Sequence, residues 1–100
     1  MVKKIGKSGI EHEFSSIEYD ESREKTRLIE DYSEIIRKTE SSSDEIVVMK
    51  LYVKVLDADV ENKEGVLRIQ KPLNENARNL ANLYGIKIEY SKNIKSSESY

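Results

Sequence analysis

The chain has 100 residues, of which 37% are hydrophobic and 36% are charged, and its formal net charge is -2. A chain of this length forms one small domain and encloses no roomy internal pocket. Its near-balance of charge gives no overall bias toward nucleic acid or membrane. Cysteine is absent, which excludes a disulfide framework and thiolate-ligated metal sites. The beginning of the chain lacks the apolar core of a signal peptide, so we expect a cytoplasmic protein with no membrane partner.

The first segment, residues 1–8, is short and polar, so we expect no packed element there. Residues 10–19 then alternate apolar and polar side chains. Ile10 and Phe14 share one parity, and the phase of the alternation changes near Ser15. This pattern predicts a β-strand that is interrupted by a bulge.

Residues 25–36 fit two patterns. Five apolar side chains have the spacing of an amphipathic helix, whereas residues 25–32 also alternate as a strand does. We interpret residues 25–32 as a strand that pairs with residues 10–19 in a hairpin, because the family resemblance described below requires that strand. The five apolar residues are Leu28, Ile29, Tyr32, Ile35 and Ile36.

A capping-box pattern, Ser42 followed three residues later by Glu45, predicts a helix that begins at Ser43 and ends near Asp57. Residues 47–55 also alternate like a strand, which leaves a competing interpretation. Four polar residues favour the helix, because their spacing would place them in one polar stripe along the helix surface. They are Lys50, Lys54, Asp57 and Glu61.

The second half of the chain carries the clearest pattern, which is strand, helix and strand in order. The strand at residues 66–69 is closed by Pro72, which cannot donate to a sheet ladder. Asn74 is the predicted N-cap of a helix that ends at Gly85, the left-handed C-cap residue. Residues 86–90 alternate again. Such a unit predicts two parallel strands joined by a right-handed crossover helix.

Together these patterns predict a single α/β domain in residues 1–91 and a disordered tail in residues 92–100. The expected architecture is a small mixed sheet of about four strands with two helices, in the order β-β-α-β-α-β, covered mainly on one face. A sheet with so little cover leaves apolar surface exposed. We therefore expect a homodimer that forms through the open sheet face or an edge strand.

The string GVLRIQKPLNENARNLANLYGIKIEY, at residues 65–90, resembles the closing βαβ unit of restriction-endonuclease-like domains of the Mrr and PD-(D/E)XK type. SGIEHEFSSI resembles the opening strand of an archaeal branch of that superfamily, and MKLYVKVLDADV resembles the helix before the closing unit. The resemblance covers residues 8–90. It implies a restriction-endonuclease-like fold with a carboxylate site for a divalent metal.

The sequence departs from the family pattern where the chemistry would take place. Ser15 stands where the archaeal branch commonly has Asp after Glu-Phe. Glu30-Asp31-Tyr32 stands where the family has Glu-x-Lys, so the lysine is missing. Phosphodiester hydrolysis needs a metal held by carboxylates and a group that activates water. The carboxylates that could still collect Mg²⁺ are Glu13, Glu30 and Asp31, although solvated strand residues are their simpler interpretation.

Other candidate site residues are set beside their structural interpretations. His12 lies between two glutamates and is more simply a partly buried structural histidine than a ligand or an acid–base group. Four basic residues near the closing unit form a candidate nucleic-acid patch, although scattered lysine and arginine are expected on such a surface. They are Arg68, Lys71, Arg78 and Lys87. The sequence contains no P-loop, dinucleotide-binding turn, zinc spacing or nucleophile elbow.

The resemblance and its departures leave three functions in competition. The first is a non-catalytic, nuclease-derived interaction module, associated with nucleic-acid processing, that contacts an unidentified protein partner. The second is a residual nuclease that uses Mg²⁺ bound by Glu13, Glu30 and Asp31, and the third is DNA binding without cleavage. We expect the first function, with no catalytic residue and no cofactor, because two catalytic positions are lost.

Overall fold

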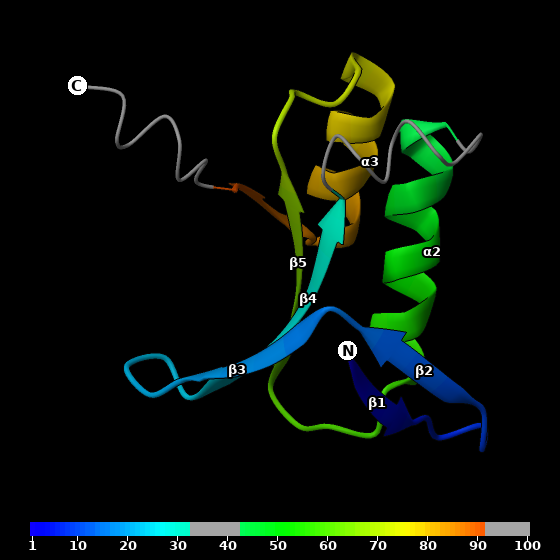
Figure 1. The fold of residues 1–100 in the computed structure, drawn as a ribbon, viewed down its shortest axis with the longest axis vertical. Helices are drawn as coiled ribbons and strands as arrows, with labels where there is room; N and C mark the ends of the chain where they lie inside the picture. The colour runs from blue at the N-terminus through cyan, green and yellow to red at the C-terminus, as the bar shows by residue number, and fades with distance from the viewer. Residues whose placement is uncertain (33–42, 92–100) are drawn as a thin grey trace.

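The computed structural model describes residues 1–32 and 43–91 of the chain. These residues form two helices and six strands (Figure 1). The expected tail at residues 92–100 and the residues Ile35 and Ile36 lie outside the described parts. Neither helix in the described parts is long and apolar enough to cross a membrane. The elements are β1 (Val2–Ile5), β2 (Glu11–Phe14), β3 (Ser16–Asp20), β4 (Lys25–Tyr32), α2 (Asp44–Asp57), β5 (Lys63–Ile69), α3 (Glu75–Tyr84) and β6 (Lys87–Tyr90).

Four of the strands form one mixed sheet in the order β3-β4-β5-β6. The β3 and β4 strands are an antiparallel hairpin in which Ile17 lies opposite Leu28, whereas β5 runs parallel to β4 and to β6. Both helices cover the same face of this sheet (Figure 1). The predicted α/β class, the strand at residues 25–32 and the helix after it are therefore confirmed, and the alternative assignments of those two segments are wrong.

The expectation that residues 1–8 form no packed element is wrong. The β1 strand pairs antiparallel with β2, with Val2 opposite Phe14 and Ile5 opposite Glu11. All four residues of β1 are exposed, so backbone hydrogen bonds hold this strand. A hydrophobic period appears in a sequence only where one face of an element is buried. The exposed residues of β1 therefore show no such period.

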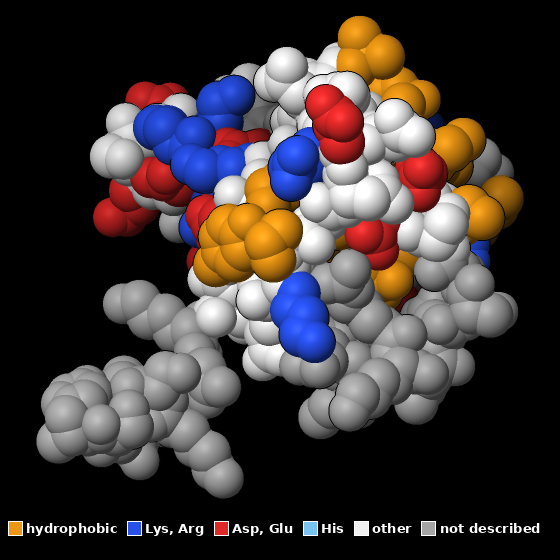
Figure 2. All heavy atoms as spheres, turned by 90° about the horizontal axis from the view of Figure 1, so that it is seen from above, with side chains coloured by type: hydrophobic (Ala, Val, Ile, Leu, Met, Phe, Trp, Pro, Cys, Tyr) orange, Lys and Arg blue, Asp and Glu red, His pale blue; other side chains and the backbone are white. Residues whose placement is uncertain are grey.

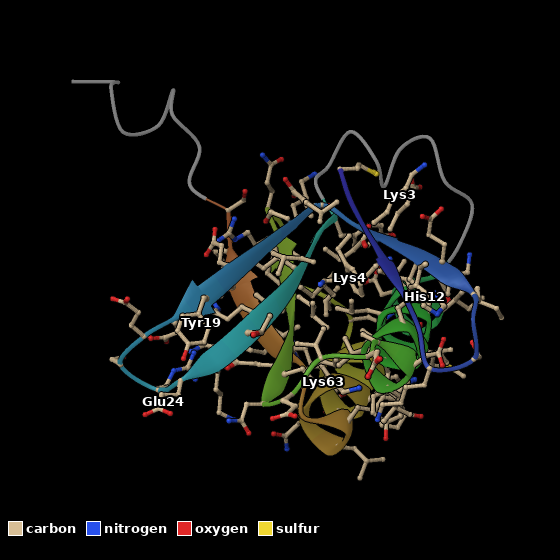
Figure 3. The ribbon with its side chains drawn as sticks, turned by 90° about the horizontal axis from the view of Figure 1, so that it is seen from below. Lys3, Lys4, His12, Tyr19, Glu24 and Lys63 are labelled. Atoms are coloured by element: carbon tan, nitrogen blue, oxygen red, sulfur yellow. The ribbon has the colours of Figure 1, made fainter. Side chains whose placement is uncertain are left out.

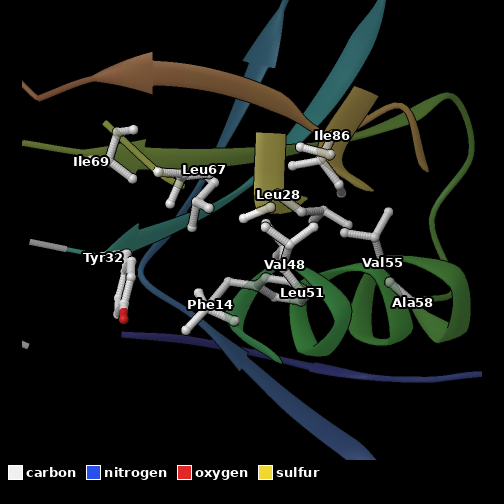
Figure 4. Packing of buried hydrophobic residues seen from close by; sticks show 14 residues of the cluster. Phe14, Leu28, Tyr32, Val48, Leu51, Val55, Ala58, Leu67, Ile69 and Ile86 are labelled. Atoms are coloured by element: carbon white, nitrogen blue, oxygen red, sulfur yellow. The ribbon is translucent and has the colours of Figure 1, made fainter. Parts of the chain in front are cut away.

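The hydrophobic core fills the space between the sheet and the two helices (Figure 4). Alternate residues of β4 and β5 point toward the helices, as the two-residue period of a strand requires. Phe14 at the end of β2 is fully buried in the same cluster. The largest contributions come from Phe14, Leu28, Tyr32, Val48, Leu51, Leu67 and Ile69.

Local signals fix the ends of both helices. Ser43 is the N-cap of α2 and accepts a backbone N–H with its hydroxyl at 3.3 Å, so the helix begins one residue later than a cap at Ser42 predicts. The Asn74 side chain caps α3 by accepting a backbone N–H at 2.8 Å. Gly85, with φ of 71°, ends α3 in the left-handed conformation, as the sequence predicts.

The sheet face that points away from the helices is charged. Arg27 on β4 pairs with Glu18 at 3.4 Å and also with Glu89, while Arg68 on β5 lies 3.5 Å from each of the same two carboxylates. Ile29 shares this face but is fully buried. Figure 2 shows acidic and basic side chains mixed on the side opposite the helices. The expected apolar surface on the open face is therefore wrong for the part of the sheet that the structure describes.

Candidate interaction surface

The α2 helix is apolar on two sides. Its inner side packs against the sheet through four residues, each at most 9% exposed, which are Val47, Val48, Leu51 and Val55. Its outer side carries four more apolar residues that we call the outer stripe. In the outer stripe, Ile46 is 44% exposed, Met49 46%, Val53 59% and Leu56 53%.

The outer stripe is continuous because its members are spaced three, four and three residues apart. That spacing averages about 3.5 residues and keeps the side chains on one line of a helix. Figure 2 shows hydrophobic side chains at the right-hand edge of the molecule, the side on which Figure 1 places the two helices. A helix that is apolar on all sides is typically covered on all sides. The outer stripe is therefore a surface that lacks a cover among the described residues.

A shallow depression of about 480 Å³ lies along the outer stripe from Ile46 to Val53. Its floor is almost wholly apolar and includes Ile46, Met49 and Val53, while Lys50 and Lys54 stand at its margin. Contiguous apolar surface with a charged rim is typical of a protein–protein interaction site.

Two sets of contacts hold α2 rigidly. The rings of Tyr52 and Tyr84 stack with their centroids 4.1 Å apart, which fixes α2 against α3. At the C-terminal end of α2, Lys63 Nζ donates to the carbonyl oxygens of Leu56 at 2.9 Å and Ala58 at 2.7 Å. Partial burial lowers the pKa of Lys63. The outer stripe therefore lies on a preformed element, and little conformational entropy is lost when it binds.

Lys54 lies on one flank of the outer stripe and is already engaged. Its Nζ atom donates to Glu30 Oε1 and to the backbone carbonyl of Glu13, each at 2.6 Å. It also lies 4.9 Å from the centre of the Phe14 ring. One ammonium group thus joins α2 to both β2 and β4. Lys50, one turn earlier on the same flank, is exposed and has no ion partner among the described residues.

The opposite flank of the outer stripe begins with Glu45. Its Oε1 atom accepts a hydrogen bond from Asn74 Nδ2 at 3.1 Å, and this bond is the main cause that lowers the pKa of Glu45. Asp44 Oδ2 accepts the backbone N–H of Asn74 at 3.0 Å. The first turns of α2 and α3 are therefore tied together, and Glu45 is ionised at neutral pH.

The structure does not bring the three candidate metal ligands together. Glu30 and Asp31 are adjacent on β4, so they point to opposite faces of the sheet. Glu30 lies on the helix side, where Lys54 binds it, and Glu13 is exposed on β2. Within residues 1–32 and 43–91, no three His, Cys, Asp or Glu side chains are grouped closely enough to hold a metal. The Mg²⁺ site that the resemblance implies does not fit this arrangement.

The four candidate nucleic-acid residues do not form one surface. Arg68 is on the open sheet face between two carboxylates, whereas Arg78 is on α3 and donates to a backbone carbonyl at 3.2 Å. Lys71 follows β5, and Lys87 begins β6 on the face that carries Arg68. The acidic residues beside Arg68 oppose the approach of a phosphate.

His12 is part of a structural tie, as its simpler interpretation predicts. The His12 side chain (Figure 3) is 13% exposed. Its Nε2 atom lies 2.7 Å from Asp57 Oδ2 at the C-terminal end of α2. The Ser8 hydroxyl donates to the same oxygen at 2.7 Å. These two contacts, the bond from Ser8 first, lower the pKa of Asp57. Ser8 and His12 both bind the Asp57 carboxylate. The Ser8 hydroxyl is therefore not paired with the His12 ring as a catalytic nucleophile is paired with its general base.

The outer stripe is the surface that sequence reasoning missed. The predicted polar stripe of Lys50, Lys54 and Asp57 occupies only one flank of α2, and Glu61 lies beyond the end of the helix. One sequence signal could have revealed the outer stripe. It is a second group of apolar residues with helical spacing, interleaved with the apolar residues that form the buried side of α2. Comparison with protein-family models, with curated proteins and with solved structures finds no match for the chain.

Proposed function

We propose that this chain is a non-catalytic interaction module that binds a protein partner through the outer stripe of α2. The observation that carries the proposal is the exposure of the outer stripe, in which each side chain is between 44% and 59% exposed on a rigid helix. Sites for small molecules are concave and place a few polar groups around the ligand. The depression on α2 is shallow and apolar instead, so it suits a protein surface better than a small molecule.

Lys54 and β4 support the non-catalytic part of the proposal. The Lys54 ammonium group binds Glu30, and Asp31 faces the other side of the sheet. At the position where the resemblance expects Asp, the Ser15 hydroxyl accepts the backbone N–H of Asp31 at 2.9 Å. The Glu30 carboxylate thus ties β4 to α2, and the Ser15 hydroxyl ties the link between β2 and β3 to the backbone of β4.

A nuclease-derived origin and an association with nucleic-acid processing are part of the same proposal. Their support is the resemblance of residues 65–90 and the order of the elements around them. The partner in contact with α2 is a protein in this proposal, because an apolar stripe offers no phosphate contact.

A photo-crosslinking amino acid in place of Met49 tests the proposed surface in cells that produce the protein. We expect irradiation to give a discrete adduct of defined mass, and we expect Val53→Lys in the same chain to remove that adduct. The matched control carries the same crosslinker in place of Leu83, which is 75% exposed on α3 but lies outside the outer stripe. The proposal fails when position 49 gives no adduct, or when position 83 gives the same one.

A further inference from the structure

We infer that the partner of the outer stripe is the same stripe on a second copy of the chain, with the two α2 helices side by side and parallel. This inference rests on the proposed function and names the partner. The outer stripe has the spacing of alternate a and d positions in a heptad, with Ile46 and Val53 at a and Met49 and Leu56 at d. A seam of this kind is complementary to itself.

The residue types at these positions favour a two-stranded parallel pair. Ile46 and Val53 are β-branched and occupy the a positions, and Leu56 occupies a d position, which is the combination that favours two strands in parallel coiled coils. Met49 at the other d position has an unbranched side chain that adapts to an irregular gap.

The charges on the two flanks complement each other in the same arrangement. Glu45 takes the g position and Lys50 takes the e position five residues later. In a parallel pair, a g residue meets the e residue five positions further along the partner helix, so each Glu45 meets the Lys50 of the other copy. An antiparallel pair would instead bring the two Lys50 side chains together across the two-fold axis.

The apolar area that the two stripes can bury sets the expected affinity of the dimer. Half-exposed side chains on two helices bury only a few hundred square ångströms of apolar surface in total, at roughly 60 to 120 Å² for each completely buried side chain. Stable complexes bury about 1,200 Å² or more. Because α2 is already folded, only the side chains of the outer stripe and its flanks lose conformational entropy in the contact. We expect a dimer with a dissociation constant on the order of tens of micromolar.

Sedimentation equilibrium of the full chain between about 10 and 300 µM tests the pairing. We expect a mass that rises from one chain toward two, and a mass of one chain throughout this range for Val53→Lys. Met49→Lys should give the same result. Circular dichroism of both variants checks that they remain folded, which we expect because these side chains are already 59% and 46% exposed.

Charge exchange tests the parallel orientation. We expect Glu45→Lys alone and Lys50→Glu alone each to weaken the dimer about tenfold, because each replaces two attractive contacts by two repulsive ones. An equimolar mixture of the two variants should regain wild-type affinity, since both contacts are attractive in the mixed dimer. Glu45→Gln keeps the acceptor for Asn74 and should weaken the dimer only a few-fold. In 1 M salt the differences in dimer affinity between these variants and the wild type should become smaller, because salt screens the charges.

Three results would overturn this inference. A mass of one chain at every concentration excludes the second copy as the partner. A dimer that survives Val53→Lys and Met49→Lys uses another surface. A dimer that Glu45→Lys leaves unchanged is not the parallel pair. When the mass is that of one chain but position 49 still crosslinks to another protein, the proposed function stands and only this inference fails.

Discussion

Lys54 joins three elements through one ammonium group, so its removal should be costly for a surface residue. Lys54→Met keeps the aliphatic stem but removes the donor to Glu30 and to the Glu13 carbonyl. We expect a loss of about 1 to 2 kcal/mol in the free energy of unfolding, because the bond to Glu30 is partly buried and the Glu30 carboxylate would lose its cation. The matched control Lys50→Met should change it by less than about 0.5 kcal/mol. Urea unfolding of the two variants measures the difference, and equal losses would contradict the role of Lys54.

Asp20 gives the clearest pH dependence of a single group. Its carboxylate accepts hydrogen bonds from Arg23 Nε at 2.7 Å and from the Ser22 hydroxyl at 2.8 Å, and these bonds lower its pKa to about 2. Because the folded pKa is below the unfolded one, the stabilising contribution is complete above pH 4 and is lost as the pH falls toward 2.

Two variants separate the causes of the low pKa of Asp20. Arg23→Gln removes the largest cause and should raise the pKa toward its ordinary value of 3.8. Ser22→Ala should raise it less. Titration of the Asp20 carboxyl carbon by NMR measures both shifts. A pKa that stays near 2 in Arg23→Gln would show that the arginine is not the cause.

Among the packed elements, β5 passes α2 and Ile86, the residue before β6, at Gly65 without room for a side chain. A Cβ atom there would lie 2.7 Å from Ile86 Cδ1 and 2.9 Å from Val55 Cγ2. We expect Gly65→Ala to lower the free energy of unfolding by about 1 to 3 kcal/mol. In a Val55→Ala background the cost should be smaller, because that change removes one of the two clashing atoms. Equal costs in both backgrounds, measured by denaturant unfolding, would contradict this packing.

Sequence patterns predicted most elements because those elements have strong local signals. Asn74 and Gly85 set the ends of α3. Residues 25–32 are the exception, because their local pattern fits a helix as well, and the strand β4 was predicted from the family resemblance. The patterns missed β1, since backbone pairing holds it and its side chains are exposed. They also missed the outer stripe of α2. Periodicity shows which residues share a face, but it does not show which of two apolar faces the rest of the chain covers.

The ion pair between Lys54 and Glu30 depends on the whole fold and could not be predicted from the sequence. Glu30 and Lys54 are 24 residues apart, and they meet only because the fold brings the C-terminal half of α2 beside β4. Neighbours on a strand, such as Glu30 and Asp31, are close in sequence but face opposite sides of the sheet. The family resemblance proposed Glu13, Glu30 and Asp31 as metal ligands, and the fold does not group these three side chains.

A metal titration checks this separation. We expect Mg²⁺ and Mn²⁺ to cause no saturable amide shifts at Glu13 or Glu30, because Lys54 holds Glu30 and Asp31 lies on the other face. We also expect no nicking of plasmid DNA by the wild type or by Glu30→Gln. Saturable shifts at these residues, together with nicking that Glu30→Gln abolishes, would establish the nuclease instead.

We propose that copies of the chain associate through the outer stripe, and a dilution series of the chain followed by amide and methyl NMR tests this self-association residue by residue. Between about 1 mM and 10 µM, we expect concentration-dependent shifts at Ile46, Met49, Val53 and Leu56, with none at the exposed control Leu83. The series also reports on the sheet face and both edge strands. Shifts that centre on β3, β6 or the charged face, with the outer stripe unchanged, would contradict the claim.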